Sequence, residues 1–143
     1  MRSKSVKRRI QQDFEMLSRL SYRNLMSLRA YIREPDRFSL VYDYMPCGSL
    51  EDVMREVRGN QRQLSWEVRL RVAVGIVKGL QYLHLSCNPR ILHCNLKPTN
   101  VMLDEDYEPR LADCGLARTM NNFRTAGSEY SAPEVFQNCR YFR

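Results

Sequence analysis

The sequence predicts an α+β fold, as one domain or as part of a larger one. Apolar residues recur at helical spacing before residue 20, and two runs between residues 26 and 44 alternate apolar with polar residues, as strands do. A long apolar helix pattern and several short β-like segments follow. A chain of 143 residues with 43% hydrophobic content is large enough to bury one core. Helices combined with a hairpin and small strands are typical of the α+β class.

The first third of the chain is expected to form a helix followed by an antiparallel hairpin. A helix is expected over residues 6–20, because apolar residues there are spaced by four and three: Ile10, Phe14, Leu17 and Leu20. Alternation over 26–32 and over 38–44 predicts two strands. The short turn with proline and aspartate at 33–36 favours antiparallel pairing of these strands.

Two capped helices are expected next. Ser49 can cap a short helix over 50–57 and Ser65 a longer one over 66–84, because serine side chains accept hydrogen bonds from the first N–H groups of a helix. The longer helix is expected to be mostly buried, along a face made of Trp66, Leu70, Ala73, Val77 and Leu80 and widened by Val72, Ile76 and Leu83.

Glycines and short strands complete the expected elements. Gly75 and Gly79 lie inside the long helix, where they cost stability but permit close packing. Short strands are expected at 90–92, 101–103 and 109–112. The segment 117–131 is polar and rich in hydroxyl groups, and we expect it to be a loop.

Charge and cysteine usage exclude several classes of function. The chain carries a net charge of +7, but five of its 23 basic residues precede the first acid, Asp13, so the remainder has 18 basic and 16 acidic groups. No aromatic residues interleave with that basic segment, and no nucleic-acid partner is expected. Five scattered cysteines without a C-x-x-C pair predict free thiols. No apolar run approaches the roughly 20 residues that span a bilayer, so we expect a soluble chain that does not span a membrane.

Three short motifs occur in a fixed order. They read H-C-N-L-K-P-T-N at 93–100, D-C-G at 113–115 and A-P-E at 132–134. Their order and spacing resemble the catalytic loop, the D-F-G segment and the A-P-E segment of protein kinases. The phrases Y-R-N-L at 22–25 and L-V-Y-D-Y-M-P at 40–46 resemble the plant receptor-like kinases in particular, and within them an inactive member.

The resemblance implies a truncated protein-kinase-like fold, with residues 1–143 as a partial kinase domain. Residues 1 to about 45 would be the helix and hairpin of the small lobe up to the hinge, and 46–143 the start of the large lobe through A-P-E. The family continues with further large-lobe helices. We therefore expect the helix over 66–84 to expose apolar surface, and the chain to be marginally stable or to depend on a partner.

The resemblance also places residues in the roles of phosphoryl transfer. Asn95 takes the position of the aspartate that accepts the proton of the attacking hydroxyl, and a carboxamide has almost no basicity. Lys97 matches the lysine that neutralises the transferring phosphate. Asn100 and Asp113 match the metal ligands; they would either hold Mg²⁺ weakly or serve a hydrogen-bond network that fixes the loop. Cys94 replaces an arginine that reads a phosphate on the activation segment.

The expected nucleotide-binding elements are incomplete. Tyr42 matches a gatekeeper, and the backbone groups of Asp43 and Met45 match the hinge that contacts adenine. No G-x-G-x-x-G occurs, the strand lysine is missing, and Asp13 stands where the family has a helix glutamate. ATP and Mg²⁺ are the implied cofactors, bound weakly or not at all.

Three hypotheses for function follow. The first is a pseudokinase module that associates with receptor-like kinases or receptor-like proteins of a membrane signalling complex, on the cytoplasmic side of the plasma membrane by family resemblance. The second is an active ATP-dependent serine/threonine protein kinase. The third is a truncated product without independent function, whose Met1 would be an internal methionine of a longer reading frame. The position of Asn95 favours a protein that is not an enzyme.

Overall fold

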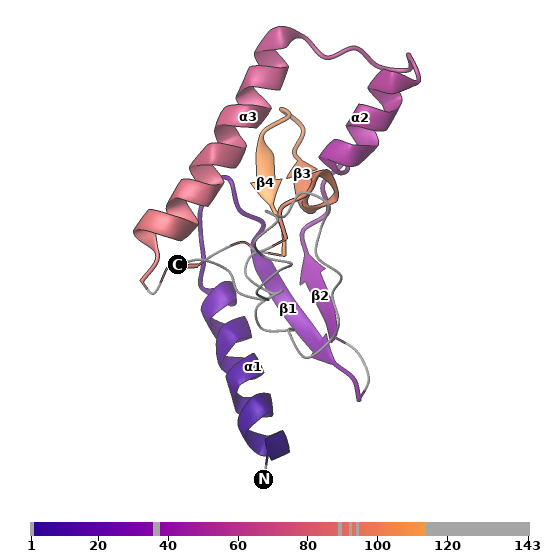
Figure 1. Cartoon of the computed structure of the whole chain (residues 1–143). Coiled ribbons are helices and arrows are strands. Elements are labelled where there is room, and N and C mark those ends of the chain that lie inside the picture. Colours follow the sequence, from indigo (N-terminus) through magenta and orange to yellow (C-terminus); the bar gives the residue numbers. More distant parts are fainter. Residues whose placement is uncertain (1, 36–37, 89, 92, 94, 114–143) are drawn as a thin grey trace, which may run out of the picture.

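The computed structural model describes residues 2–35, 38–88, 90–91, 93 and 95–113. Its elements are, in chain order, α1 (Arg2–Ser18), β1 (Leu28–Arg33), β2 (Phe38–Tyr42), α2 (Leu50–Arg58), α3 (Trp66–Gln81), a π-helical turn (Tyr82–Ser86), a 3-10 turn (Pro98–Asn100), β3 (Val101–Leu103) and β4 (Pro109–Leu111). Helix α1 lies beside the β1–β2 hairpin, whereas α2 and α3 flank the β3–β4 hairpin (Figure 1). The predicted α+β class is confirmed.

The predicted pairing of helix and hairpin at the start of the chain is also confirmed. Phe14 and Leu17 of α1 are buried against Leu28 of β1, and the rings of Phe14 and Tyr31 stack with centroids 4.5 Å apart. Strands β1 and β2 are antiparallel, with an irregularity in the register between Leu28 and Ala30. The stripe of apolar residues read from helical spacing is therefore the face of α1 that packs on the hairpin.

The second core lies between α3 and the β3–β4 hairpin. It contains Leu83, Val101 and Leu111, all of which are buried, together with Leu25 and Ile91. Strands β3 and β4 pair in antiparallel register, as their predicted ranges allow. The strand expected at 90–92 is wrong for its first two residues, because Arg90 and Ile91 have no strand structure.

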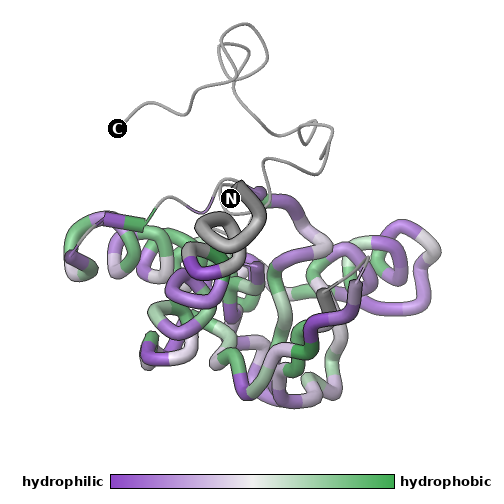
Figure 2. The backbone as a smooth tube through the Cα atoms, turned by 90° about the horizontal axis from the view of Figure 1, so that it is seen from below, coloured by the Kyte–Doolittle hydropathy of each residue, from purple (hydrophilic) through white to green (hydrophobic). Residues whose placement is uncertain are grey.

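The long helix buries only part of the predicted face: Val72 and Leu83, which were expected to widen that face, are buried, but most of its main residues are exposed. Trp66, Leu70 and Val77 are 76%, 53% and 62% exposed, whereas the buried positions of α3 are Val72, Gly75 and Gly79. Figure 2 shows hydrophobic and hydrophilic residues interspersed along the helices, so hydropathy alone does not single out the buried face. The glycine-bearing stripe approaches β4, and the expectation of exposed apolar side chains on this helix is met.

Both predicted serine caps are present. The Ser49 hydroxyl accepts a hydrogen bond from the Asp52 backbone N–H, and the Asp52 carboxylate accepts one in return from the Ser49 backbone N–H. Ser65 accepts from the Val68 N–H at the start of α3. These contacts satisfy N–H groups that helix starts leave without partners, and they fix where α2 and α3 begin. Among the described helices, none is both long and apolar enough to cross a membrane.

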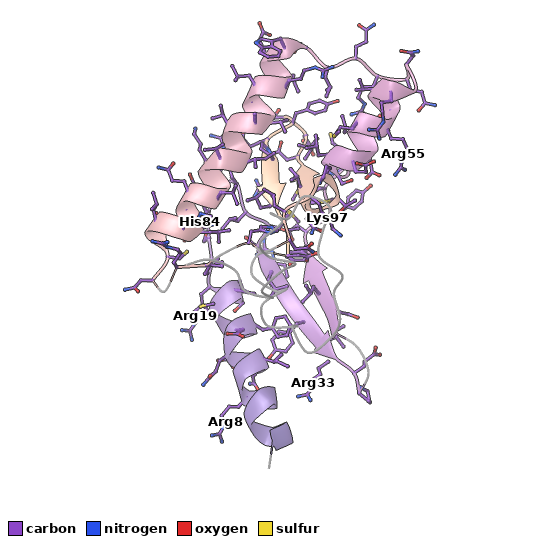
Figure 3. The ribbon with its side chains drawn as sticks, viewed as in Figure 1. Arg8, Arg19, Arg33, Arg55, His84 and Lys97 are labelled. Carbon is purple, nitrogen blue, oxygen red and sulfur yellow. The ribbon has the colours of Figure 1, made fainter. Side chains whose placement is uncertain are left out.

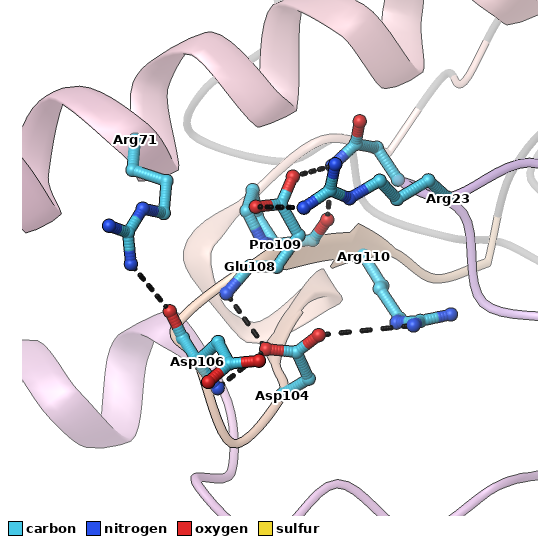
Figure 4. A network of polar contacts seen from close by, with 8 residues as sticks. Arg23, Arg71, Asp104, Asp106, Glu108, Pro109 and Arg110 are labelled. Atoms are coloured by element: carbon cyan, nitrogen blue, oxygen red, sulfur yellow. Dashed lines mark hydrogen bonds and ion pairs between the residues drawn. The ribbon is translucent and has the colours of Figure 1, made fainter.

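Asn24 joins the two halves of the structure. Its side chain, 1% exposed, donates to the Glu108 carboxylate at 2.8 Å and to the Pro109 carbonyl at 2.9 Å. Its backbone carbonyl accepts from the Leu111 N–H at 2.9 Å. Figure 4 shows this contact region, where Arg23 also reaches Glu108. The segment before β1 is thereby bonded to β4, 84 to 87 positions later in the sequence.

The two glycines of α3 make room for this contact. A Cβ atom on Gly75 would overlap the Pro109 ring, and one on Gly79 would lie 2.9 Å from the Asn24 carbonyl oxygen. The prediction that these glycines permit close packing is confirmed.

We therefore expect Gly75→Ala to destabilise the protein by about 2 kcal/mol, because overpacking outweighs the roughly 1 kcal/mol that alanine normally adds within a helix. Urea unfolding measures this difference. Gly59→Ala is the matched control, since the nearest atom to its Cβ would be 3.5 Å away, and we expect a change below about 0.5 kcal/mol. A stabilised Gly75→Ala protein would contradict the packing described here.

Candidate functional site

The candidate site forms where the loop before β3 meets the residue pair after β4. The Ala112 N–H donates to the Asn100 carbonyl at 2.8 Å, which fixes Asp113 beside the predicted catalytic loop. Tyr42, the last residue of β2, approaches from the other side. Lys97 lies in the same region, near the level where the two hairpins meet (Figure 3). Four predicted site residues are thus brought together with Tyr42: Asn95, Lys97, Asn100 and Asp113.

His93 anchors the start of the loop. Its ring is 3% exposed, and Nε2 lies 2.7 Å from the Ala112 carbonyl while Nδ1 lies 3.3 Å from the Asn95 backbone N–H. These partners assign a neutral ring that donates through Nε2 and accepts through Nδ1. Burial lowers the pKa of His93 from 6.5 to about 4, against the opposing effect of the Ala112 carbonyl. A neutral histidine therefore ties the loop to the segment that carries Asp113.

Asn100 closes the other end of the loop. Its side-chain Nδ2 donates to the Asn95 carbonyl at 2.9 Å, and the residue is 7% exposed. Asn95 is thus held through its backbone on both sides, by His93 and by Asn100. This is the hydrogen-bond network that the sequence offered as one of two roles for Asn100. The oxygen of the Asn100 amide is the end that would serve a metal ion.

Asp113 combines burial with an uncommon backbone conformation. Its φ angle of 57° lies in the left-handed region, which aspartate tolerates better than most residues. Burial raises its pKa, while the hydrogen bond from Tyr42 and the charge of Lys97 act in the opposite direction. The Tyr42 hydroxyl lies 3.3 Å from Asp113 Oδ1. A perturbed carboxylate at a strained position is typical of functional sites.

The predicted hinge follows directly after β2. The Asp43 side chain accepts two hydrogen bonds from Arg29, at 3.1 Å from Nε and 2.6 Å from a terminal nitrogen. This hydrogen-bonded pair lowers the pKa of Asp43. The Met45 carbonyl accepts from the Gly48 N–H at 3.0 Å in a turn. The Asp43 carboxylate is therefore engaged with β1, and an adenine contact by the backbone groups here stays a prediction.

The oxygen donors fit a Mg²⁺ ion only in company with phosphates. Asp113 and Asn100 supply a carboxylate and an amide oxygen, which are suitable ligands for this hard cation. No cluster of three or more histidine, cysteine or acidic side chains that could hold a metal occurs within the described part of the chain. Two protein ligands are the usual number where substrate phosphates complete the shell.

Some contacts of the site were not predicted from the sequence, and some of the predictions lie outside the described residues. The two hydrogen bonds of His93 and the pairing of Arg29 with Asp43 had no signal in the sequence beyond the presence of these residues. Cys94 and the A-P-E segment lie outside the described residues, as does the loop expected at 117–131. Asp13 lies half-buried on α1.

The buried, neutral His93 predicts a specific dependence of stability on pH. The pKa of His93 is about 4 in the folded chain and about 6.5 in the unfolded chain. Between these pH values the unfolded chain therefore binds a proton that the folded chain does not bind. Stability is therefore complete above about pH 6.5 and falls as the pH drops toward 4, by about 2 kcal/mol between pH 7 and pH 5. Urea unfolding at both values measures this loss. His93→Gln keeps an N–H donor without titrating, and the same pH dependence in that variant would contradict the assignment.

Known proteins resemble this chain over nearly its whole length. The protein kinase domain family matches residues 1–143. The chain is 70% identical over 139 residues to the inactive leucine-rich repeat receptor-like protein kinase CORYNE of Arabidopsis thaliana, covering 97% of this chain and 35% of that protein. It is 40% identical over 142 residues to the leucine-rich repeat receptor-like serine/threonine/tyrosine-protein kinase SOBIR1 of the same plant, covering 94% and 22%. The chain thus spans about a third or less of the length of these relatives.

A solved structure agrees with the sequence relatives. The pseudokinase domain of BIR2, an immune regulator of the RLK/Pelle family, matches with a TM-score of 0.77 and 35% identity, covering 93% of this chain and 41% of that one. The match confirms the predicted kinase fold and shows that the chain covers part of it. This chain therefore belongs to the protein kinase domain family, and the relatives named above are receptor-like kinases of a plant.

Proposed function

We propose that this chain is a pseudokinase module, which serves receptor-kinase signalling through association with other proteins and not through phosphoryl transfer. The observation that carries the proposal is Asn95 at the position of the catalytic base. Its backbone is fixed by His93 and Asn100, so the loop keeps its shape around a side chain that cannot accept a proton. The names of CORYNE, an inactive kinase, and of the BIR2 pseudokinase domain point the same way.

The retained groups favour a second candidate, an active serine/threonine kinase. Lys97, Asn100 and Asp113 lie together, and in an active kinase such residues hold Mg²⁺ and neutralise the transferring phosphate. When bound, Mg²⁺ would offset the negative charge of the nucleotide phosphates. We rank this candidate second, because loss of a general base alone costs about 10²–10⁴ in rate.

A phosphoryl-transfer assay separates the two candidates. We expect the unmodified chain to transfer no γ-phosphate from ATP above a protein-free control, to itself or to a general protein substrate, because Asn95 cannot take up the hydroxyl proton. Asn95→Asp is the matched comparison, since it adds only a carboxylate. Measurable turnover by the unmodified chain would overturn the pseudokinase proposal and leave the active kinase in its place.

The association half of the proposal has its own test. We propose receptor-like kinases or receptor-like proteins at the cytoplasmic side of the plasma membrane as partners. Surface plasmon resonance against the purified kinase domain of a plant receptor-like kinase should give binding that is equal, within about twofold, for the unmodified chain and for Asn95→Asp. Equal binding is expected because the base position has no part in association. Binding that requires ATP turnover would contradict a scaffold role.

A further inference from the structure

We infer that Tyr42 and Asp113 form a clasp that stands in for a bound nucleotide and competes with one. The Tyr42 hydroxyl donates to the Asp113 carboxylate and so ties the hinge end of β2 to the position of the metal ligand. In a working kinase these two regions are bridged by the nucleotide and its metal ion. The inference rests on the proposed function, in which the site no longer needs to turn over a nucleotide.

Both ends of the clasp are held by the surrounding backbone. Tyr42 pairs with Leu28 in the β1–β2 register, at the point where β2 ends. Asp113 lies two residues beyond Leu111, whose carbonyl accepts from the Met26 N–H at 2.8 Å. The hydroxyl and the carboxylate are 71 positions apart in the sequence but 3.3 Å apart in space. The contact therefore joins the two hairpins, and its Asp113 end is also held to the loop through the hydrogen bond between Ala112 and Asn100.

A small, mostly apolar cavity lies on one side of the clasp. A cavity of about 20 Å³ lies beside Tyr42 and Asp113, and its walls are otherwise apolar: Leu17, Leu20, Leu25, Met26, Leu28 and Leu111. A volume of this size holds about one water molecule. Within the described residues, this cavity therefore has room for about one water molecule and for no larger ligand group.

The Tyr42 hydroxyl and a magnesium ion would compete for one oxygen of the Asp113 carboxylate. Asp113 Oδ1 accepts the Tyr42 hydroxyl hydrogen, and the same oxygen is one of two that the residue could offer to Mg²⁺. A magnesium–nucleotide complex that binds through Oδ1 has to displace the hydroxyl, which lowers the apparent affinity for that complex, whereas binding through Oδ2 alone is not opposed.

Tyr42→Phe tests the clasp, because it removes the hydroxyl and keeps the ring. Isothermal titration with Mg²⁺ and a non-hydrolysable ATP analogue should give an affinity about tenfold higher than that of the unmodified chain. The melting temperature without ligand should fall, because the tie between the hairpins is lost. Tyr44→Phe is the matched control: Tyr44 is 87% exposed in the same segment, and neither quantity should change.

A second background distinguishes the clasp from a general effect of the substitution. Asp113→Gly removes the carboxylate while tolerating the positive φ angle, so Tyr42→Phe should lower the melting temperature no further in that background. The inference is overturned if Tyr42→Phe leaves the nucleotide affinity or the ligand-free melting temperature unchanged, or if its effect persists without the carboxylate. Phosphoryl transfer by the unmodified chain would instead overturn the proposed function and leave the clasp standing.

Discussion

The contact between Asn24 and β4 is the constraint on which the rest of the structure depends. The buried Asn24 side chain bonds Glu108 and Pro109, and the backbone groups of Asn24 and Met26 bond Leu111. The buried amide has no water to replace these partners, so each lost bond would leave an unsatisfied polar group in the core. Through this contact the hairpin β1–β2 is placed above the loop, and Tyr42 is brought to Asp113. The β2 side of the site is therefore positioned by a contact that lies outside the site.

The loop keeps its shape through contacts that do not involve the Asn95 side chain. His93 and Asn100 each hold Asn95 by its backbone, and neither bond depends on what the Asn95 side chain is. The shape of the loop therefore requires His93 and Asn100, whereas proton transfer would require a basic side chain at position 95. We propose that the shape is what this protein uses. The retained Lys97 and Asp113 agree with such a role as well as with residual metal binding.

The sequence predicted most of the elements but not which surfaces meet. Helix α1 and the hairpin followed from periodicity, because each has one apolar face and one partner to cover it. Helix α3 has apolar residues on most of its surface, so the choice of face was decided by Gly75 and Gly79, whose close approach to Pro109 and Asn24 no hydropathy pattern reveals. The site residues came from motif order. The bond between Tyr42 and Asp113 did not, because it joins segments that only the tertiary structure brings together.

The bonds that fix the loop and those that fix the hinge respond differently to dissolved salt. His93 and Asn100 are buried and uncharged where they make contact, so counter-ions have little effect on them. Arg29 and Asp43 are an ion pair with more than half of each side chain in water, where screening weakens the attraction. In concentrated salt the hinge would therefore loosen first, while the loop below it kept its form. The geometry of the loop thus depends on buried contacts, whereas the geometry of the hinge also depends on the ionic strength of the solution.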